Sequence, residues 1–285
     1  MYDDRNYGRY ALLKFKMQFL GNFQKMTTSI INDVVHYELR LQSESPDYLS
    51  MNDLIGKEIN LIFQNVIECI KCGDETKKSY NQGFCYGCFL NAPESSPCII
   101  NPELCKAHLG EGRNLDWEER NHNQPHIVYL AVSDCVKVGV TRKTQVPTRW
   151  IDQGAAYAIR LAEVSNRYTA GIIEVALKSQ FTDRTNWRKM LQNEVDSSID
   201  LTEIKWELEE LLPADLAQYI TENDEIIYLN YPVKSFPSKV NSISFDKESV
   251  ISGNLIGIKG QYLIFENGNV FNVRKHSGYK VKFEY

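Results

Sequence analysis

Four of the seven cysteines stand in two pairs that have the spacing of metal ligands. They are Cys69 and Cys72, then Cys85 and Cys88. Two C-x2-C pairs can place four thiolates at the corners of a tetrahedron, which is the arrangement of structural Zn²⁺ sites. Gly73 and Gly87 suit tight backbone turns beside the sulfurs. We therefore expect a structural zinc ion here; buried free thiols and a redox C-x2-C motif are the alternatives.

A second group of candidate ligands follows in the pattern C-x6-C-x2-H. Cys98, Cys105 and His108 would supply three ligands of a second zinc ion, and His122 or His126 the fourth. The alternative is two buried thiols and a surface histidine. Prolines make this segment rich in loops, so metal is its expected source of folding free energy, about 10–16 kcal/mol in zinc-finger peptides. A chelator should therefore unfold the cysteine-rich block before the rest of the chain.

The elements after Pro125 are short and change type in a regular order. Two strands, HIVYLAVSD and VKVGVT, precede a basic loop, and Pro147 suits the first turn of a short helix. A third strand, AIRLAEV, leads to Asn166, whose side chain can cap a helix that contains Glu174. The predicted order is β, β, α, β, α. We expect a small mixed sheet with helices on its face.

Residues 126–190 resemble the GIY-YIG endonuclease superfamily. Three motifs carry the resemblance, and they occur in the expected order along the chain. Ile127-Val128-Tyr129 stands at the GIY position, Lys137-Val138-Gly139 stands at the YIG position, and Arg149 and Glu174 stand at the helix arginine and the metal-binding glutamate. The full chain also resembles a bacterial family, itself uncharacterised, in which a cysteine-rich zinc block precedes such a core. The resemblance implies a GIY-YIG-like fold.

The same resemblance implies metal-dependent hydrolysis of phosphodiester bonds in DNA or RNA. Such cleavage needs an aligned water, a neutralised phosphate and a stabilised leaving oxygen. The implied roles are that Tyr129 orients or deprotonates the water, Arg149 binds the phosphate, and Glu174 holds a divalent cation such as Mg²⁺. Lys137 replaces the second tyrosine of the family, where an ammonium group can bind phosphate or lower the pKa of Tyr129.

Two other functions fit the same residues. The presence of Lys137 favours a non-catalytic zinc protein that binds nucleic acid or protein and keeps a GIY-YIG-like fold. A purely structural zinc protein is the weaker alternative. Taken singly, the four residues have ordinary interpretations as a strand aromatic, a solvated lysine, a surface arginine and a helix carboxylate.

The charge distribution favours a nucleic-acid partner although the chain carries a net charge of −5. Residues 126–190 contain ten Lys and Arg against five Asp and Glu. Residues 191–226 contain eleven acids and one lysine, and we expect an amphipathic helix there. Its predicted apolar side consists of Ile204, Leu208, Leu211 and Leu212. This segment either packs on the core with a solvated acidic face or mimics nucleic acid over a basic cleft.

Composition bounds the class of protein. With 285 residues and 43% hydrophobic residues, the chain is expected to fold into two or three packed modules. No apolar run is long enough to span a membrane and no signal peptide is recognisable, so we expect a cytoplasmic protein with reduced thiols. Met17 is an alternative first residue, which would leave residues 1–16 as a tail.

The predicted fold class is α+β, in five consecutive segments. These are a β-rich N-terminal segment (1–68), a cysteine-rich zinc-binding module (69–125), a GIY-YIG-like core (126–190), an acidic helical segment (191–226) and a β-rich C-terminal segment (227–285). In the last segment, Asn267-Gly268 predicts a hairpin turn because both residues tolerate positive φ. We expect the two β-rich ends to pack together as one small barrel or sandwich.

Overall fold

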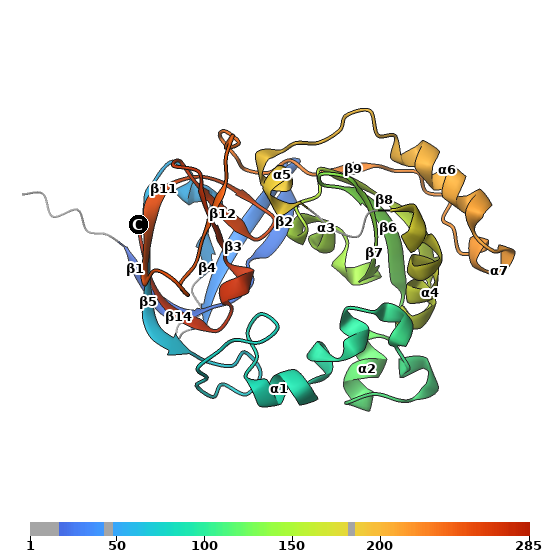
Figure 1. The fold of residues 1–285 in the computed structure, drawn as a ribbon, viewed down its shortest axis with the longest axis horizontal. Helices are drawn as coiled ribbons and strands as arrows, with labels where there is room; N and C mark the ends of the chain where they lie inside the picture. Colours follow the sequence, from blue (N-terminus) through green and yellow to red (C-terminus); the bar gives the residue numbers. More distant parts are fainter. Residues whose placement is uncertain (1–16, 43–47, 182–185) are drawn as a thin grey trace, which may run out of the picture.

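The computed structural model describes residues 17–42, 48–181 and 186–285. Residues 1–16, 43–47 and 182–185, which belong to the expected N-terminal segment and core, lie outside these ranges. The fold is α+β, as the sequence predicts, and it contains two β-sheets (Figure 1). The cysteine-rich residues run from the larger sheet to the smaller one along one side of the molecule.

A ten-stranded sheet unites the two ends of the chain. Its strand order is β10-β13-β12-β11-β5-β14-β1-β3-β2, and β4 pairs with β3. The C-terminal strand β14 lies between β5 and β1, while β11 pairs with the other edge of β5. The expected packing of the two β-rich ends is therefore confirmed, in the form of one shared sheet. Its strands are β1 (Gln18–Phe23), β2 (Thr27–Ile31), β3 (Val34–Gln42), β4 (Tyr48–Ser50), β5 (Glu58–Ile67), β10 (Asn241–Ile243), β11 (Val250–Lys259), β12 (Tyr262–Phe265), β13 (Asn269–Asn272) and β14 (Tyr279–Glu284).

Local sequence explains why these strands form. Side chains in β14 alternate between buried and partly buried, so one face of the strand meets the apolar core. The predicted hairpin turn is confirmed between β12 and β13: Gly268 has φ +79° and donates its amide hydrogen to the carbonyl of Phe265 over 2.9 Å. A residue with a Cβ atom would be strained in this conformation.

The smaller sheet has the strand order β7-β6-β8-β9. Its strands are β6 (His126–Val132), β7 (Val136–Arg142), β8 (Tyr157–Val164) and β9 (Ile227–Tyr228). With α3 (Thr148–Asp152) and α4 (Arg167–Leu177), the chain order is β, β, α, β, α, as predicted. All three strand pairs are antiparallel, so this sheet is not a mixed one.

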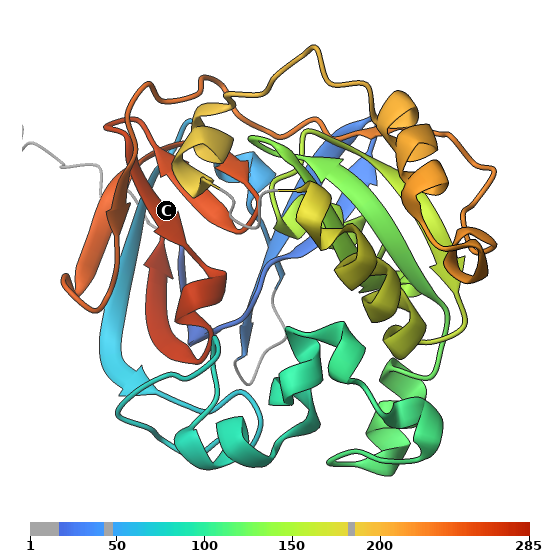
Figure 2. The same cartoon turned by 45° about the vertical axis from the view of Figure 1, so that its right-hand side comes forward.

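The central strand β6 is buried along its whole length because both of its faces are covered. Ile127, Tyr129 and Ala131 join one apolar cluster with side chains of the larger sheet. The alternate residues, Val128, Leu130 and Val132, face the cluster beneath α4 and α6 (Leu201–Leu211). Figure 2 shows α4 lying across this second face. The smaller sheet thus connects the larger sheet to the helices.

The acidic segment packs on the core through α6, and a short helix, α7 (Ala214–Ala217), follows it. Leu208 and Leu212 are buried as predicted, but Leu211 is 59% exposed. The prediction for Leu211 was wrong because the buried stripe passes through Leu201, Lys205, Leu208 and Leu212, at helical spacing. The buried ammonium group of Lys205 lies 2.7 Å from the carboxylate of Asp224.

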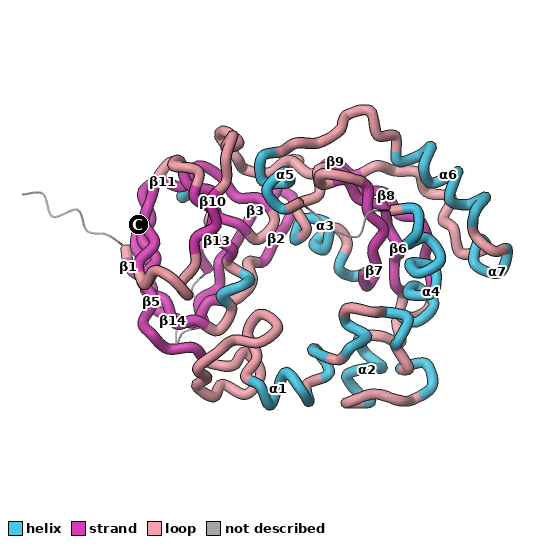
Figure 3. Tube along the Cα trace, in the orientation of Figure 1, coloured by secondary structure: helices cyan, strands magenta, loops and turns pink. Residues whose placement is uncertain are grey.

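The cysteine-rich residues contain little regular structure (Figure 3). Two short helices, α1 (Tyr86–Asn91) and α2 (Leu115–Asn121), flank a run of single 3-10 turns. A further short helix, α5 (Trp187–Gln192), stacks Trp187 on Tyr262 of the larger sheet. Within the described residues, no helix has the length and apolar character needed to cross a membrane.

Candidate metal centre and basic pocket

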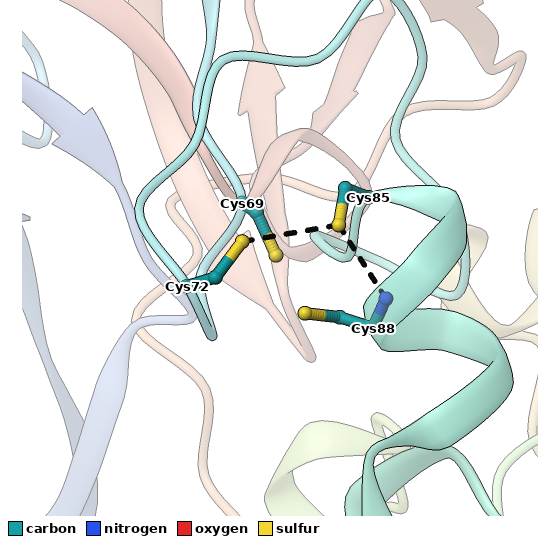
Figure 4. A group of neighbouring side chains, drawn as sticks. All are labelled: Cys69, Cys72, Cys85 and Cys88. Carbon is teal, nitrogen blue, oxygen red and sulfur yellow. Dashed lines mark hydrogen bonds between the residues drawn. The ribbon is translucent and has the colours of Figure 1, made fainter.

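The four cysteines of the C-x2-C pairs converge at the end of β5 (Figure 4). We call Cys69, Cys72, Cys85 and Cys88 the thiol cluster. Its four sulfur atoms all lie within 4.8 Å of one another, and none forms a disulfide. The Sγ atoms of Cys72 and Cys85 are 3.8 Å apart. A tetrahedral Zn²⁺ with Zn–S bonds of about 2.3 Å places two sulfurs roughly 3.8 Å apart. The cluster therefore has the donors and dimensions of a four-thiolate zinc site.

Backbone turns bring amide groups to these sulfurs. Gly73 has φ +79°, as expected for the first pair, whereas Gly87 lies inside α1 and makes no turn. The second turn comes from Gly83, with φ +132°, where a Cβ atom would lie 2.8 Å from the side chain of Ile70. The prediction for Gly87 was wrong because Cys85 caps α1, and the helix itself makes the second pair.

Amide hydrogen bonds reach two sulfurs of this cluster and favour the thiolate form of Cys69. The amide of Lys71 donates to Sγ of Cys69, and that of Cys88 donates to Sγ of Cys85, each over 3.4 Å. Burial opposes ionisation of Cys69, but the amide hydrogen bonds outweigh it and lower the pKa of this thiol to about 6. Thiolate is the form that binds metal.

The second set of predicted ligands is only partly brought together. Cys98 and Cys105 lie beside Nδ1 of His122, at 3.8 and 3.5 Å. His108 lies apart, since its ring stacks on Tyr168 at 4.5 Å between centroids. His126 is fully buried, and its Nδ1 lies 2.7 Å from the carbonyl of Gln124.

Sequence reasoning missed one member of this second group, which is Glu118. Its carboxylate contacts Nδ1 of His122. The signal was present in the sequence, because Glu118 and His122 are four residues apart and fall on one side of α2. We call Cys98, Cys105, Glu118 and His122 the buried group; their donor atoms lie within 4.8 Å of one another.

Tyr129 is enclosed in the core. It is 1% exposed, packs edge-on against Trp150, and donates its hydroxyl hydrogen to Oε1 of Gln153 over 2.7 Å. A Cβ atom at Gly139, its partner on β7, would lie 2.6 Å from the hydroxyl oxygen, so only glycine leaves room for the ring. Burial raises the pKa of Tyr129, and the nearby positive charge of Arg149 opposes this rise. The phenol is therefore neutral at physiological pH.

The other three predicted catalytic residues line two different pockets. Lys137 and Glu174 line a pocket of about 270 Å³ between β7, α4 and the turn at Glu103. Arg149 lines the second pocket, described below. Burial raises the pKa of Glu174 to about 7, although the positive charge of Arg167 opposes the rise. Arg149 interacts with Tyr129 and lies within electrostatic range of Glu174, while Lys137 lines the first pocket.

The second pocket, of about 340 Å³, is lined by residues of both β-rich ends, of the cysteine-rich residues and of the core 126–190. We call it the basic pocket. Its lining contains two carboxylates, those of Glu94 and Asp152. Five cationic side chains surround it, each from a different strand, helix, turn or loop: Lys25, Arg142, Arg149, Arg167 and Arg274. No described residue of the acidic segment 191–226 lines this pocket, which argues against a nucleic-acid mimic there.

Both acids of the basic pocket are already neutralised by lysines. Asp152 forms an ion pair with Lys25, and Glu94 lies 2.7 Å from Nζ of Lys71. Burial lowers the pKa of Arg142 and of Arg274, because the surrounding protein disfavours their charge. The pocket therefore has a surplus of positive charge that its own acids do not balance.

Comparison with known proteins gave one match. Residues 56–281 match a protein-family model described as "Protein of unknown function (DUF2797)". The chain belongs to the DUF2797 family. Neither a curated protein nor a solved structure matches it.

The DUF2797 span contains nearly all of the chemistry described above. It includes the thiol cluster, the buried group and the small sheet. Of the five cations around the basic pocket, only Lys25 lies outside the span. The two candidate centres and the pocket therefore belong to the part of the chain that defines the family.

Proposed function

We propose that this DUF2797 protein is a zinc protein that binds nucleic acid through a phosphate held in the basic pocket. One observation carries the proposal: the partly buried guanidinium groups of Arg142 and Arg274 line this pocket, and no carboxylate of the described residues lies within ion-pair distance of either one. In the part of the chain that the structure describes, neither Arg142 nor Arg274 forms an ion pair. Charges that are partly removed from water without a partner are costly, and a bound anion would offset that cost.

The donors of the pocket match phosphate chemistry. Guanidinium groups bind phosphate oxygens with two parallel hydrogen bonds, which distinguishes them from lysine. Trp117 also lines the pocket and is partly exposed. An indole face next to a phosphate site offers a stacking surface for an unpaired base. This combination of phosphate and base contacts favours single-stranded nucleic acid over a free phosphate ion.

Binding is tested by fluorescence anisotropy of labelled single-stranded DNA and RNA over a series of salt concentrations. The double variant Arg142→Ala/Arg274→Ala should bind about tenfold more weakly, and its salt slope should fall by roughly 1.4 to 1.8, as for two lost phosphate contacts. The matched control is Arg188→Ala, an exposed arginine on α5 outside the pocket. Equal losses in the control and the double variant would contradict the proposal.

A second candidate function is Mg²⁺-dependent cleavage of the bound strand. It is favoured by the contact between Tyr129 and Arg149 and by the proximity of Glu174, together with the resemblance to GIY-YIG endonucleases. In this scheme Arg149 holds the scissile phosphate. Glu174 is the carboxylate that would hold Mg²⁺, and the ion would stabilise the leaving oxygen.

Because Tyr129 is enclosed in the core, its role in that scheme differs from orienting or deprotonating the water. A hydroxyl that is buried and bonded to Gln153 does not meet solvent water, so Tyr129 positions Arg149 and does not deprotonate the nucleophile. Arg149→Ala and Glu174→Ala should both abolish cleavage, by a factor on the order of 10² to 10³ each. Tyr129→Phe should have a smaller effect.

The two functions are separated by incubating labelled strands with the protein and Mg²⁺ and analysing them on a denaturing gel. Cleavage that is lost in the Arg149 and Glu174 variants supports the enzyme. Binding that leaves the strand intact in the wild-type protein supports the non-catalytic function. Cleavage that persists in both variants would remove these residues from the mechanism.

A further inference from the structure

The buried group has the geometry of a second metal site. Nδ1 of His122 lies 3.5 Å from Sγ of Cys105 and 3.8 Å from Sγ of Cys98. In a tetrahedral site with Zn–S of about 2.3 Å and Zn–N of about 2.0–2.1 Å, a sulfur and a nitrogen lie roughly 3.5 Å apart. Glu118 brings a carboxylate to the same point from one helical turn earlier. The four donor atoms thus gather around one point, all within 4.8 Å of one another.

Burial favours a cation at this point when the two thiols are deprotonated. The four side chains are between 2% and 8% exposed, so they are largely shielded from water. Two thiolates and a carboxylate would carry three negative charges. A divalent cation and the neighbouring guanidinium of Arg167 would balance these charges, while an empty group would have to bury protonated or unpaired donors.

The buried group is also connected to the wall of the basic pocket. Arg167 donates from Nε to the carbonyl of Cys98 and from its amide to the carbonyl of His122, over 2.9 and 2.8 Å. Trp117 packs edge-on against the ring of His122 at 4.9 Å between centroids. Arg167 and Trp117 both line the pocket. Two side chains of the basic pocket, those of Arg167 and Trp117, are therefore held by residues of the buried group.

We propose that Cys98, Cys105, Glu118 and His122 bind a second metal ion, of the Zn²⁺ class, separate from the ion of the thiol cluster. Two thiolates, an imidazole and a carboxylate suit Zn²⁺, and four protein donors leave no open position for a substrate. The ion is structural, and it positions Arg167 and Trp117. His108, which the sequence pattern favoured as a ligand, has no part in it.

Metal content measured by elemental analysis of the purified full-length protein tests the proposal. We expect two zinc ions per chain in the wild type. His122→Asn and Cys105→Ser should each lower the count to one. The matched controls His108→Asn and Cys135→Ser should leave it at two, since both residues lie outside the two groups. One ion in the wild type, or a loss in the His108 variant but not in the His122 variant, would overturn the proposal.

Cobalt substitution gives a second measurement, which can be made on a variant with a more conservative substitution. Glu118→Gln keeps the size of the side chain and its position on α2. In the Co²⁺-loaded protein, this variant should shift the visible d–d bands of one site and leave the second site unchanged. An unaltered spectrum would exclude the carboxylate from the ligand set. Neither measurement depends on nucleic-acid binding, so a failure of the proposed function leaves both tests valid.

Discussion

The thiol cluster and the buried group present similar donors in opposite surroundings. Cys72 is exposed and Cys85 and Cys88 are partly exposed, whereas no donor of the buried group is more than 8% exposed. The thiol cluster draws Cys69 and Cys72 from the loop after β5, and Cys85 and Cys88 from the start of α1. The buried group draws its ligands from two 3-10 turns and α2, and it contacts α4 through Arg167.

This difference separates two uses of metal in one chain. An ion in the thiol cluster would hold together loops that have almost no apolar core of their own, since the local cluster contains only Cys69, Phe84 and Ala92 as buried members. An ion in the buried group would instead fix the position of a helix that covers the smaller sheet. The first ion is therefore expected to stabilise a local segment, and the second to stabilise the core.

The largest expected effect is on stability. Cys105→Ala should lower the free energy of unfolding by roughly 4 kcal/mol, because a lost metal leaves buried donors unpaired beneath α4. Cys72→Ala should change the main transition by less than about 1 kcal/mol. Thermal and urea unfolding measure both values. Hydrogen exchange should show the Cys72 variant opening only at residues near 69–92. Equal losses of unfolding free energy in the two variants would contradict the distinction between a local and a global role of the two centres.

The second prediction concerns the order of metal release. With excess chelator, the ion of the exposed thiol cluster should leave first. The ion of the buried group should leave on the order of a hundredfold more slowly, because its release requires local unfolding around α2 and α4. A colorimetric zinc indicator in a stopped-flow or manual-mixing experiment follows both phases. Release in a single phase of two equivalents would mean that the two centres open together.

The two centres also differ in how far the sequence predicts them. The thiol cluster consists of two C-x2-C pairs. This spacing alone identifies its four candidate ligands. The ligands of the buried group come from two 3-10 turns and from α2. Its histidine lies seventeen residues from Cys105. His108 is nearer in sequence, but its 3-10 turn directs the ring to Tyr168. Ligand choice here depends on tertiary packing, which short-range patterns do not contain.

The fold also shows that short-range sequence patterns predict local elements but not tertiary contacts. Alternating apolar residues predict the strands of both ends, and the β, β, α, β, α order of the core is readable from turn and cap residues such as Asn166. The basic pocket is not readable in this way, because its five cations come from segments as distant as Lys25 and Arg274. The positive surplus of residues 126–190 indicated only the three arginines within that segment.

The third prediction links the comparison to binding. If the buried group positions Arg167 and Trp117, then Cys105→Ala should weaken binding of single-stranded nucleic acid by about tenfold, or roughly 1.4 kcal/mol. Cys72→Ala should leave the affinity within about a factor of two, since no residue of the thiol cluster lines the basic pocket. Anisotropy titrations at one fixed salt concentration compare the variants. Circular dichroism confirms beforehand that each variant keeps its sheets.

The smallest effect uses Glu174 as a reporter of α4, the helix that Arg167 ties to the buried group. The folded protein holds the pKa of this carboxyl near 7, above its ordinary value of 4.5, so the folded state binds the proton more tightly than the unfolded state. Stability should therefore fall as pH rises from about 4.5 to about 7 and stay level above that, in magnesium-free buffer.

Glu174→Gln should remove this contribution, because an amide does not ionise. The variant should be more stable than the wild type at pH 7.5 by about 1 kcal/mol after allowance for solvent screening, and the two should converge near pH 4.5. Urea unfolding at both pH values measures the difference. A variant that is less stable at pH 7.5 would show that the carboxylate forms a stabilising ion pair there. In that case Glu174 would stabilise α4, and a role for this carboxylate in holding a cation would lose its physical basis.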